Sequence, residues 1–266
     1  MANQKKAQSG SLKTEVSEGV ALVTIDRPHR KNAITQAMWL ELAETVTALG
    51  KNPETRMIVI MGAGGDFSAG ADIGEFDEVR RNAETARFYE NANSAAFAAV
   101  RDAPVPTLAA IRGICFGGGF GLAAACDLRV AEDDARFCVP AAKLGLAYPV
   151  DAMIDIVEAL GPQLARYLTY SAASIDAATA LSAGFLLEIV ERGTLEFRAR
   201  ELARVIAANA PLSVRASKAA IRASLSRDGK AYQLAEALGA ATFDSLDYGE
   251  GRSAFREKRK PQFHGK

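Results

Sequence analysis

The sequence has 266 residues, of which 49% are hydrophobic and 24% charged, so it can bury a sizeable core in one large domain. Lysine plus arginine and aspartate plus glutamate each total 32, which gives a formal net charge of zero. This balance argues against a protein that binds nucleic acid or an anionic membrane through a basic surface.

The cysteines and histidines do not form a metal-binding pattern. Cys115, Cys126 and Cys138 have no CxxC spacing, and the only histidines, His29 and His264, lie far from them in the sequence. A zinc site is therefore not expected. Because the cysteines are odd in number and lie on apolar segments, they are interpreted as buried thiols of a reducing compartment.

The first residues do not resemble an export signal. Residues 1–10, MANQKKAQSG, include lysines but lack the apolar stretch of a secretory signal. No run of about 18 uncharged apolar residues occurs in the sequence, so a membrane-spanning helix is not expected. These observations predict a cytoplasmic protein with a disordered tail over residues 1–10.

The first half of the chain alternates strands with helices. Residues 12–17 and 20–25 are β-like runs separated by Glu18 and Gly19, which predicts a hairpin. Apolar residues at helical spacing follow Thr35, a good N-cap, and predict a helix over 35–50. Further elements are expected in this order: a strand at 56–62, a helix near 83–100, a strand at 107–111 and a helix that ends near Cys126.

The second half of the chain becomes progressively helical. Short strands are predicted at LRVA (128–131), at ARFCVP (135–140) and near 186–191. The predicted helices after them cover 195–209, 212–225, 228–246 and 249–258. Strands alternating with helices, followed by helices alone, predict an α/β core over 11–195 and a helical region over 196–266.

Two glycine-containing loops are the clearest candidates for a functional site. FSAGAD (67–72) and FGGGFG (116–121) each follow a predicted strand and precede a predicted helix. Glycine lets the backbone approach a ligand closely, and a helix N-terminus presents N–H groups without partners. Two such groups aimed at one point would bind a developing oxyanion. The alternative is that the glycines only relieve crowding between packed elements.

The two glycine loops match two other enzyme classes, dinucleotide-binding enzymes and serine hydrolases, only incompletely. Gly119 to Ala124 match the loose G-x-G-x-x-A dinucleotide pattern, but the following strand carries no acid to bind a ribose. A serine hydrolase would need glycine before Ser68 where Asp66 stands, and neither histidine is placed to act as its base.

Both loops belong to a set of motifs that resembles the crotonase (enoyl-CoA hydratase/isomerase) superfamily. In the order of that superfamily they are VALVTIDRPHRKNAIT, GGDFSAGADI, AAIRGICFGGGFGLAAACDLRVA, ARFCVPAAKLGL and EKRKPQFHGK. The resemblance implies a spiral of ββα units with a C-terminal α-helical trimerisation region, assembled as a homotrimer or a dimer of trimers. It also implies an acyl-CoA enzyme that stabilises a thioester enolate through two backbone N–H groups, those of Ala71 and Gly118.

The resemblance further implies where coenzyme A binds. It enters as part of the thioester substrate, so no separate cofactor is expected. The positions that match CoA contacts of the superfamily are Arg30, Lys31, Ala33, Ala69, Asp72, Ile73, Phe263 and Lys266. The last two match a region that reaches CoA from a neighbouring subunit. Gly74 stands where a lysine is often found, and a plain solvated turn stays an alternative for Arg30 and Lys31.

The sequence departs from the superfamily at both catalytic acids. Its hydratases use two glutamates, and matching without gaps places Gly121 and Ala141 at those positions. Neither residue can carry a proton, and general acid–base help is worth about 10²–10⁴-fold in rate. Hydration by the usual pair of glutamates is therefore not expected.

Tyr148 and Asp151 are polar residues close to the second of these positions. Methylmalonyl-CoA decarboxylases of the superfamily have a tyrosine at the matching position, although they have histidine where this chain has Ala71. Decarboxylation needs an oxyanion hole and a hydrogen bond to the carboxylate but no base, and Tyr148 is a candidate donor. Other interpretations stay open: Tyr148 as a pocket wall, Asp151 as a favourable helix-start residue, an acid from 75–90, or a non-catalytic acyl-CoA-binding protein.

Overall fold

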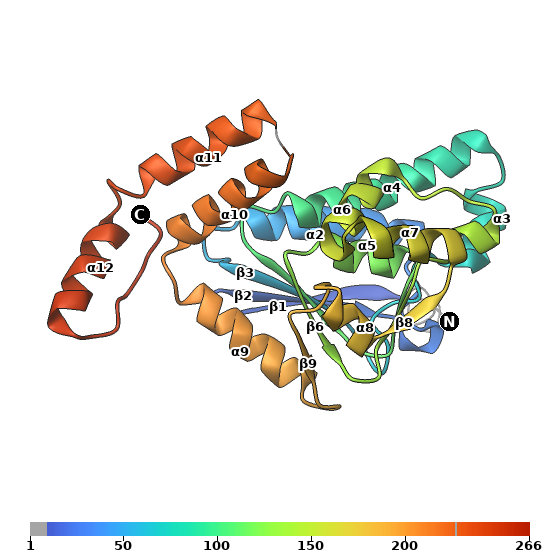
Figure 1. Cartoon of the computed structure of the whole chain (residues 1–266), viewed down its shortest axis with the longest axis horizontal. Helices are drawn as coiled ribbons and strands as arrows, with labels where there is room; N and C mark the ends of the chain where they lie inside the picture. Colours follow the sequence, from blue (N-terminus) through green and yellow to red (C-terminus); the bar gives the residue numbers. More distant parts are fainter. Residues whose placement is uncertain (1–9, 227) are drawn as a thin grey trace, which may run out of the picture.

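A six-stranded sheet forms the centre of the protein in the computed structural model, which describes residues 10–226 and 228–266 (Figure 1). Its strand order is β1-β2-β3-β4-β6-β9, and all pairs are parallel except β1 with β2. The strands are β1 (Ser11–Ser17), β2 (Val20–Asp26), β3 (Met57–Gly62), β4 (Thr107–Ile111), β6 (Leu128–Glu132) and β9 (Glu188–Val190). The predicted hairpin is confirmed, with Glu18 and Gly19 both at positive φ in its turn.

A smaller sheet follows the second glycine loop. It contains β5 (Ile114–Phe116), β7 (Arg136–Cys138) and β8 (Ser174–Asp176) in the order β5-β7-β8. β5 pairs with β7 in parallel, and β7 pairs with β8 antiparallel. The backbone therefore leaves the large sheet at the end of β4 and enters the small one directly before the glycines.

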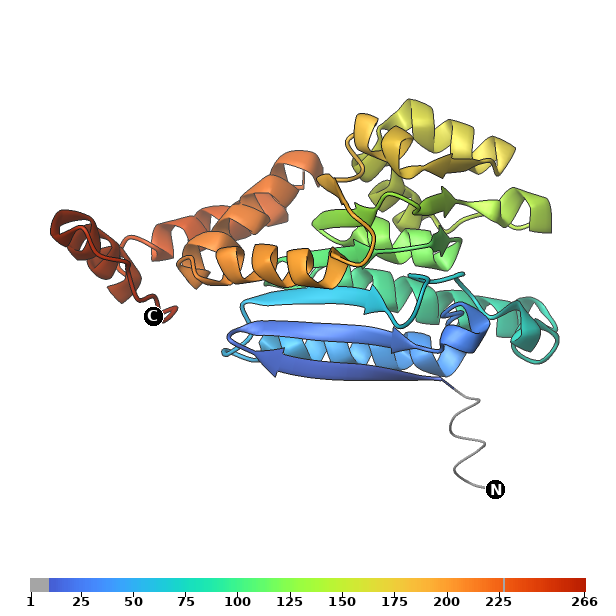
Figure 2. The same ribbon diagram turned by 90° about the horizontal axis from the view of Figure 1, so that it is seen from below.

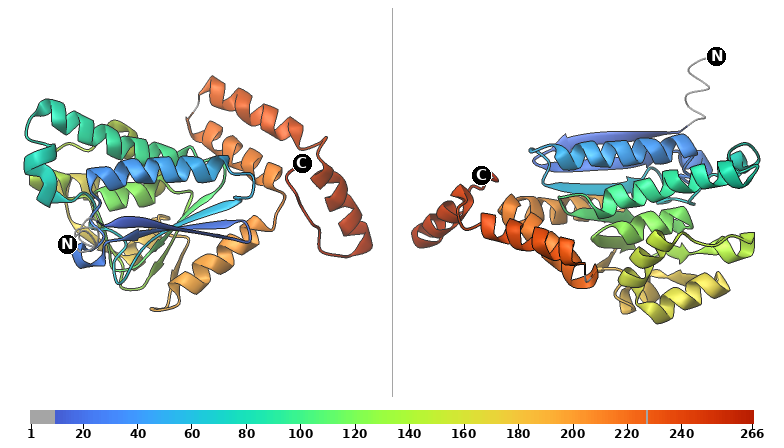
Figure 3. Two further views of the ribbon diagram at one scale, coloured as in Figure 1. Left: turned by 180° about the vertical axis from the view of Figure 1, so that it is seen from behind. Right: turned by 90° about the horizontal axis from the view of Figure 1, so that it is seen from above.

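Helices cover both faces of the large sheet (Figures 1 and 3). On one face lie α2 (Gln36–Lys51), α4 (Ala83–Arg101) and α5 (Gly118–Ala125), which pack on residues such as Val23 and Ile60. On the other face α9 (Leu195–Ala207) packs on the alternate residues, such as Leu22 and Val59. Successive side chains of a strand point to opposite faces of the sheet. Because both faces are covered by helices, β2 and β3 are apolar on both faces and their sequences are continuous hydrophobic runs.

Some of the remaining helices complete the core, and the last ones extend away from it. α6 (Val150–Leu160) and α7 (Pro162–Ser171) lie between β7 and β8 in the chain, α8 (Ala177–Ser182) lies between β8 and β9, and α3 (Phe76–Val79) precedes α4. After α9 the chain forms α10 (Pro211–Ser226), α11 (Gly229–Ala241) and α12 (Leu246–Glu257). Figure 2 shows α11 and α12 extending away from the sheet, and large apolar side chains are exposed on them and between them, including Phe255 on α12 and Phe243 between the two helices.

The structure corrects the boundary between the last two predicted helices. They were expected over 228–246 and 249–258, but α11 ends at Ala241 and α12 begins at Leu246. Ser245 sets the new start, because its side chain accepts a hydrogen bond from the Tyr248 amide at 3.1 Å and caps α12. Thr35 caps α2 in the same way, as predicted, by accepting from the Met38 amide at 3.3 Å.

The remaining predictions concern a membrane-spanning helix, a metal site and the N-terminal tail. Among the described residues, no helix combines the length and apolarity needed to cross a bilayer, and no three metal-binding side chains gather in one place. The disordered tail predicted for residues 1–10 lies outside the described residues except for Gly10.

Candidate active site

The two glycine loops lie against each other at one end of the large sheet. Ser68 forms a parallel bridge with Cys115, since its amide donates to the Ile114 carbonyl at 3.0 Å and its carbonyl accepts from the Phe116 amide at 2.9 Å. On its other side the first loop pairs with Ile34, whose amide donates to the Gly70 carbonyl at 2.7 Å. The first loop is thus held between two backbone segments.

Glycine is required where the two loops touch. Gly70 has a φ of +89°, and a Cβ on it would lie 2.6 Å from the Phe116 carbonyl oxygen and 2.7 Å from the Gly118 nitrogen. A Cβ on Gly119 would lie 2.6 Å from the Ser68 carbonyl oxygen. Such distances are too short for any side chain, so these glycines allow backbone-to-backbone packing. Crowding between the loops, the alternative raised by the sequence, therefore accounts for glycine at Gly70 and Gly119.

The second loop turns sharply into α5. Gly117 has a φ of 52° and a ψ of −123°, a conformation that residues with a Cβ rarely adopt, and Gly118 is the first residue of the helix. A Cβ on Gly118 would lie 2.9 Å from Cζ2 of the fully buried Trp39. Trp39 comes from α2 and in turn packs edge-on against Phe97 of α4, with ring centroids 5.5 Å apart.

Two backbone amides next to this turn have no acceptor within residues 10–226 and 228–266. They belong to Ala71 and Gly118, and a Cβ built on Gly118 would lie 3.6 Å from the Ala71 nitrogen. The Gly118 amide is free because the first N–H groups of a helix have no intrahelical partner. Two unpaired donors on neighbouring backbone segments can hold one negatively charged oxygen if both point at it.

Both residues line a cavity of about 100 Å³. Its walls consist mainly of backbone and apolar side chains, with a few polar groups; they are Ala69, Ala71, Ile73, Phe76, Arg80, Glu90, Asn93, Phe97, Gly117, Gly118, Pro140, Ala141, Leu144, Leu146, Ala147, Tyr148 and Pro149. Of the site residues predicted from the sequence, the structure brings together Ala69, Ala71, Ile73, Gly118 and Tyr148 here.

The space for the first missing glutamate is filled by other side chains. A Cβ on Gly121 would lie 2.8 Å from the Tyr148 hydroxyl oxygen and 2.9 Å from Cζ of Phe97. A glutamate at this position would have to displace both groups. Ala141, the second position, lies in the cavity wall instead and is partly exposed.

The Tyr148 hydroxyl donates a hydrogen bond to the Gly117 carbonyl at 2.5 Å, and the Gly121 amide donates to the same oxygen at 3.0 Å. A phenol has one proton to donate, so this proton is not free to bind a ligand while the contact lasts. Burial raises the pKa of Tyr148 far above its usual range, so the hydroxyl stays protonated. The carbonyl of Gly117 and the amide of Gly118 belong to one peptide group.

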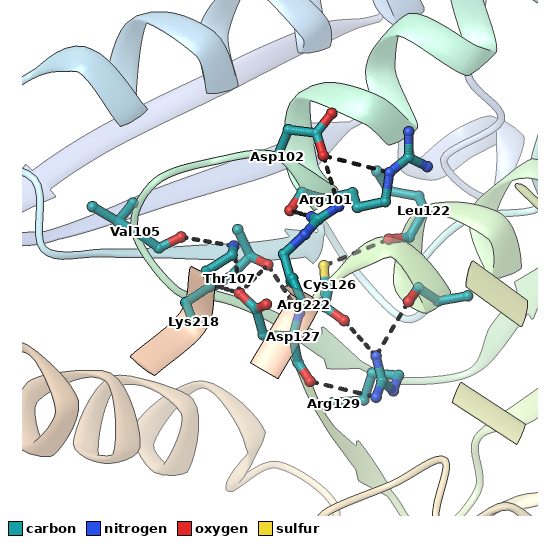
Figure 4. Close-up of polar contacts among 11 residues, drawn as sticks. Arg101, Asp102, Val105, Thr107, Leu122, Cys126, Asp127, Arg129, Lys218 and Arg222 are labelled. Atoms are coloured by element: carbon teal, nitrogen blue, oxygen red, sulfur yellow. Dashed lines mark hydrogen bonds and ion pairs between the residues drawn. The ribbon is translucent and has the colours of Figure 1, made fainter. Parts of the chain in front are cut away.

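The other end of α5 is surrounded by charged side chains (Figure 4). The buried Arg129 donates from Nη1 to the Cys126 carbonyl at 2.6 Å and the Ala123 carbonyl at 3.2 Å, and from Nε to the Phe185 carbonyl at 2.6 Å. It therefore satisfies carbonyls that the helix end leaves without partners.

Asp127, the first charged residue after the glycines, ties this end of α5 to the core and to α10. Its Oδ2 accepts from the Thr107 amide and from Lys218 Nζ, each at 2.7 Å. Lys218 also donates to the Val105 carbonyl at 3.0 Å. All of these contacts can be followed in Figure 4, and they give Asp127 a structural role.

The expected coenzyme A residues of the first turn lie beside the first glycine loop. The Ala69 amide donates to the Lys31 carbonyl at 2.8 Å, and Arg30 Nη2 lies 3.3 Å from a Cβ built on Gly74. Ala33, a buried residue, accepts at its carbonyl from Arg27 at 3.1 Å. Arg30, Lys31 and Ala33 are outside the lining of the cavity.

Asp72 is already paired within the protein. Its Oδ2 lies 2.6 Å from Nη1 of the buried Arg27, and its Oδ1 accepts from the Gly74 amide at 3.0 Å. Burial by itself would raise the pKa of Asp72, but the hydrogen bonds from Arg27 and Gly74 outweigh it and hold the pKa below its usual value. Asp72 therefore braces the loop that carries Ala71.

Three other predicted site residues lie away from the cavity. Asp151 is in the first turn of α6, where its charge is favourable to the helix, and is absent from the cavity lining. The Phe263 carbonyl accepts from Arg56 Nη2 at 2.7 Å, and the Lys266 carbonyl accepts from the Leu246 amide at 2.7 Å. In Figure 1 this C-terminal end lies beside α12, far from α3.

Three polar residues of the cavity were not among the site residues predicted from the sequence. Arg80 precedes α4, and Glu90 and Asn93 lie one turn apart on that helix. Glu90 falls inside the acidic range 75–90, but Arg80 and Asn93 carried no distinguishing signal. The polar pattern of α4 is typical of a solvated helix face, and periodicity does not tell which polar residue faces a cavity.

Comparisons with known proteins agree with the fold and with the motifs. The family model described as "Enoyl-CoA hydratase/isomerase" matches residues 15–266. A (7aS)-7a-methyl-1,5-dioxo-2,3,5,6,7,7a-hexahydro-1H-indene-carboxyl-CoA hydrolase from Mycobacterium tuberculosis is 38% identical over 209 residues, 78% of this chain and 82% of the relative. A crotonyl-CoA hydratase from Syntrophomonas wolfei is 32% identical over 95% of this chain and 97% of the relative.

Solved structures lead to the same family. The crystal structure of an enoyl-CoA hydratase/isomerase family protein from Hyphomonas neptunium has a TM-score of 0.91 and 33% sequence identity, and covers 97% of this chain and 98% of that chain. A structure from Magnetospirillum magneticum, titled an enoyl-CoA hydratase/carnithine racemase, has a TM-score of 0.90 and 32% identity. The chain therefore belongs to the enoyl-CoA hydratase/isomerase family, as its motifs predicted.

Proposed function

We propose that the protein is an acyl-CoA enzyme that stabilises negative charge on the thioester oxygen through the amides of Ala71 and Gly118. The observation that carries this proposal is the pair of amides without acceptors at the wall of one cavity. Donors fixed in place before the reaction cost no reorganisation when charge develops, and each is worth about 10²–10³ in turnover.

The reaction is one that does not depend on the usual pair of glutamates. Gly121 has no room for a carboxylate, and Ala141 offers none. The names of the relatives include both hydratases and a CoA hydrolase, so family membership is compatible with more than one reaction. Both reactions place negative charge on a carbonyl oxygen, which is the step that Ala71 and Gly118 would assist.

Tyr148 acts in this proposal as a positioning residue. Its hydroxyl and the Gly121 amide both donate to the Gly117 carbonyl, which fixes the plane of the peptide whose N–H belongs to Gly118. Two donors on one carbonyl also polarise that peptide, which strengthens its own N–H as a donor.

Decarboxylation of a malonyl-type thioester is the second candidate, because it needs the oxyanion donors but neither glutamate. In this case the Tyr148 hydroxyl would have to leave Gly117 to orient the carboxylate, which makes Tyr148 a weaker anchor than the sequence suggested. A non-catalytic acyl-CoA-binding protein is the third.

Coenzyme A is proposed to run from the cavity past the first turn, near Arg30, Lys31 and Ala33. A homotrimer or dimer of trimers, in which Phe263 and Lys266 reach a neighbouring chain, is part of the same proposal. The exposed apolar side chains of α11 and α12 support such an assembly, since large apolar surfaces favour protein–protein contact. Solution mass of three or six chains is expected, and a stable monomer with full thioester affinity would contradict it.

Three measurements on the purified chain separate the candidates: crotonyl-CoA hydration, methylmalonyl-CoA decarboxylation, and calorimetric binding of both thioesters. We expect thioester binding and poor hydration. Efficient hydration would refute the argument from Gly121 and Ala141. Decarboxylation would favour the second candidate, and binding without turnover of any thioester would favour the third.

A further inference from the structure

The cavity has a polar side that the proposed chemistry does not use. Its oxyanion donors are backbone groups of the two glycine loops, whereas Arg80, Glu90 and Asn93 reach it from the start of α4 and from the helix itself. The other side chains of the lining are apolar apart from Tyr148, whose proton is already donated to Gly117. These three residues are the groups available to contact a substituent of the acyl chain.

Asn93 is the most informative of the three. It is only 8% exposed, its Oδ1 is buried without a hydrogen-bond partner, and its amide bonds to no other described residue. Leaving a buried amide unpaired costs free energy, so native proteins rarely do so. An unpaired buried amide in a cavity wall is expected of a binding site whose ligand supplies the missing hydrogen-bond partner.

Arg80 is held in the same cavity wall by aromatic contacts. Its guanidinium carbon lies 4.4 Å from the ring centroids of both Phe76 and Tyr89, which meet edge-to-face with centroids 5.6 Å apart. Its side chain is 12% exposed, and Nη1 lies 3.7 Å from a Glu90 carboxylate oxygen. The Arg80 and Glu90 charges oppose each other, so this side of the cavity is polar and close to neutral.

We propose that Arg80, Glu90 and Asn93 bind a neutral oxygen substituent, a hydroxyl or keto group, on the acyl chain of the thioester. A hydrocarbon chain would leave Asn93 unpaired, and a carboxylate would gain no net attraction because Glu90 offsets the charge of Arg80. A hydroxyl can pair with either end of the Asn93 amide, because the amide offers an acceptor at one end and donors at the other, and a keto oxygen can accept from the donor end. The inference rests on the proposed function, since it assumes that the acyl group enters this cavity.

The test uses a five-carbon series of thioesters in binding calorimetry. Pentanoyl-CoA is compared with its hydroxy and keto derivatives at C3, C4 and C5, and with glutaryl-CoA, which ends in a carboxylate. At least one hydroxy or keto thioester is expected to bind about tenfold more tightly than pentanoyl-CoA, since about 1.4 kcal/mol corresponds to tenfold. Preference for hydroxy or for keto compounds reports which end of the Asn93 amide faces the ligand.

Asn93→Leu is the decisive variant, because leucine has a similar size but no polar atom. It is expected to remove the tenfold preference, taken as the ratio of the two affinities on the same variant, and a thermal melt checks its folding. Asn91→Leu is the matched control, since Asn91 is an exposed asparagine of the same helix, and it should keep the preference.

Three outcomes overturn the inference. One is equal affinity for pentanoyl-CoA and all oxygenated thioesters, one is tightest binding of glutaryl-CoA, and one is a preference that survives in folded Asn93→Leu. In each of these the CoA thioester still binds, so the proposed function stands. If no thioester of the series binds at all, the proposed function fails and this inference fails with it.

Discussion

The two ends of α5 differ in whether their terminal backbone groups have hydrogen-bond partners. At the N-terminus, Gly118 opens the helix with a bare amide next to that of Ala71, and residues 113–126 contain no charged side chain. At the C-terminus, Arg129 donates to several carbonyls and Asp127 is tied to Lys218. The protein supplies partners at the C-terminal end, and we propose that a ligand supplies them at the N-terminal end.

This difference separates a structural role from a functional one without reference to the reaction. A buried helix end without partners is costly, so the contacts of Arg129 are what a folded protein needs. In the proposed function, the open amides of Ala71 and Gly118 gain their partner when an oxyanion binds. Changes at the C-terminal end should therefore affect stability, and changes at the N-terminal end should affect turnover.

The largest expected effect is on stability, from Arg129→Met. The variant removes the donor of the Cys126 and Phe185 carbonyls, whereas the Ala123 carbonyl keeps the Cys126 amide at 3.3 Å. Since each unsatisfied buried group costs about 1–3 kcal/mol, we expect a loss of about 3–5 kcal/mol in unfolding free energy. Chemical denaturation at fixed protein concentration measures it. Arg204→Met, which removes an exposed pair with Glu18, is the control and should cost less than about 1 kcal/mol. Equal losses in both variants would refute the structural role.

Next comes Gly118→Pro, which removes the proposed donor at a helix position that proline tolerates. We expect turnover of the true substrate to fall about 10²–10³-fold. Gly118→Ala is the matched control, because it adds the same Cβ against Trp39 but keeps the N–H. If the two variants lose equal activity, the clash with Trp39 is responsible and the donor role is wrong.

A smaller effect is expected from Tyr148→Phe. Losing one hydrogen bond to the Gly117 carbonyl should cost about 0.5–1.5 kcal/mol, which lowers kcat about two- to tenfold. Because the ring keeps its packing, KM should change little. Tyr170→Phe, at a tyrosine that is 77% exposed, is the control. A change in KM alone would identify Tyr148 as a pocket wall.

The smallest effect is a pH dependence of stability at Asp155, which lies near the structural end of α5. Burial raises the pKa of Asp155 to about 6, although its hydrogen bond from Arg101 at 2.8 Å opposes the change. Because the folded protein binds this proton more tightly than the unfolded chain, the contribution is present at low pH and is lost as pH rises through 6. Between pH 5 and 8 the loss is about 1 kcal/mol.

Asp155→Asn cannot titrate and should lack this pH dependence. The measurement is the difference in unfolding free energy between the two proteins at pH 5 and at pH 8. That difference should move in favour of the variant by about 1 kcal/mol as pH rises. A constant difference would mean that burial does not dominate at Asp155.

Much of this arrangement could be predicted from local sequence patterns. The hairpin at Glu18 and Gly19, the cap at Thr35 and the two glycine loops each depend on residues close together in the chain. The motifs also identified the family, which the comparisons confirm. Local chemistry is visible in a sequence because the groups that interact are neighbours.

What could not be predicted depends on contacts between distant segments. Three features each bring together different elements of the fold. They are the packing of Trp39 against Gly118, the hydrogen bond from the Tyr148 hydroxyl to the Gly117 carbonyl, and the place of Asn93 in the cavity wall. A tyrosine near a missing acid suggested an anchor for substrate, whereas the folded chain gives its proton to the backbone. Residue type alone does not tell which partner lies nearest.

The most direct test of the two open amides is the infrared spectrum of a bound thioester labelled with ¹³C at its carbonyl. Hydrogen bonds to the carbonyl oxygen weaken the C=O bond and lower its stretching frequency. We predict a lower frequency on the wild-type protein and on Gly118→Ala than in water, with much of this shift lost on Gly118→Pro. The same frequency on all three proteins, or no shift from water on the wild type, would contradict the role given to Ala71 and Gly118.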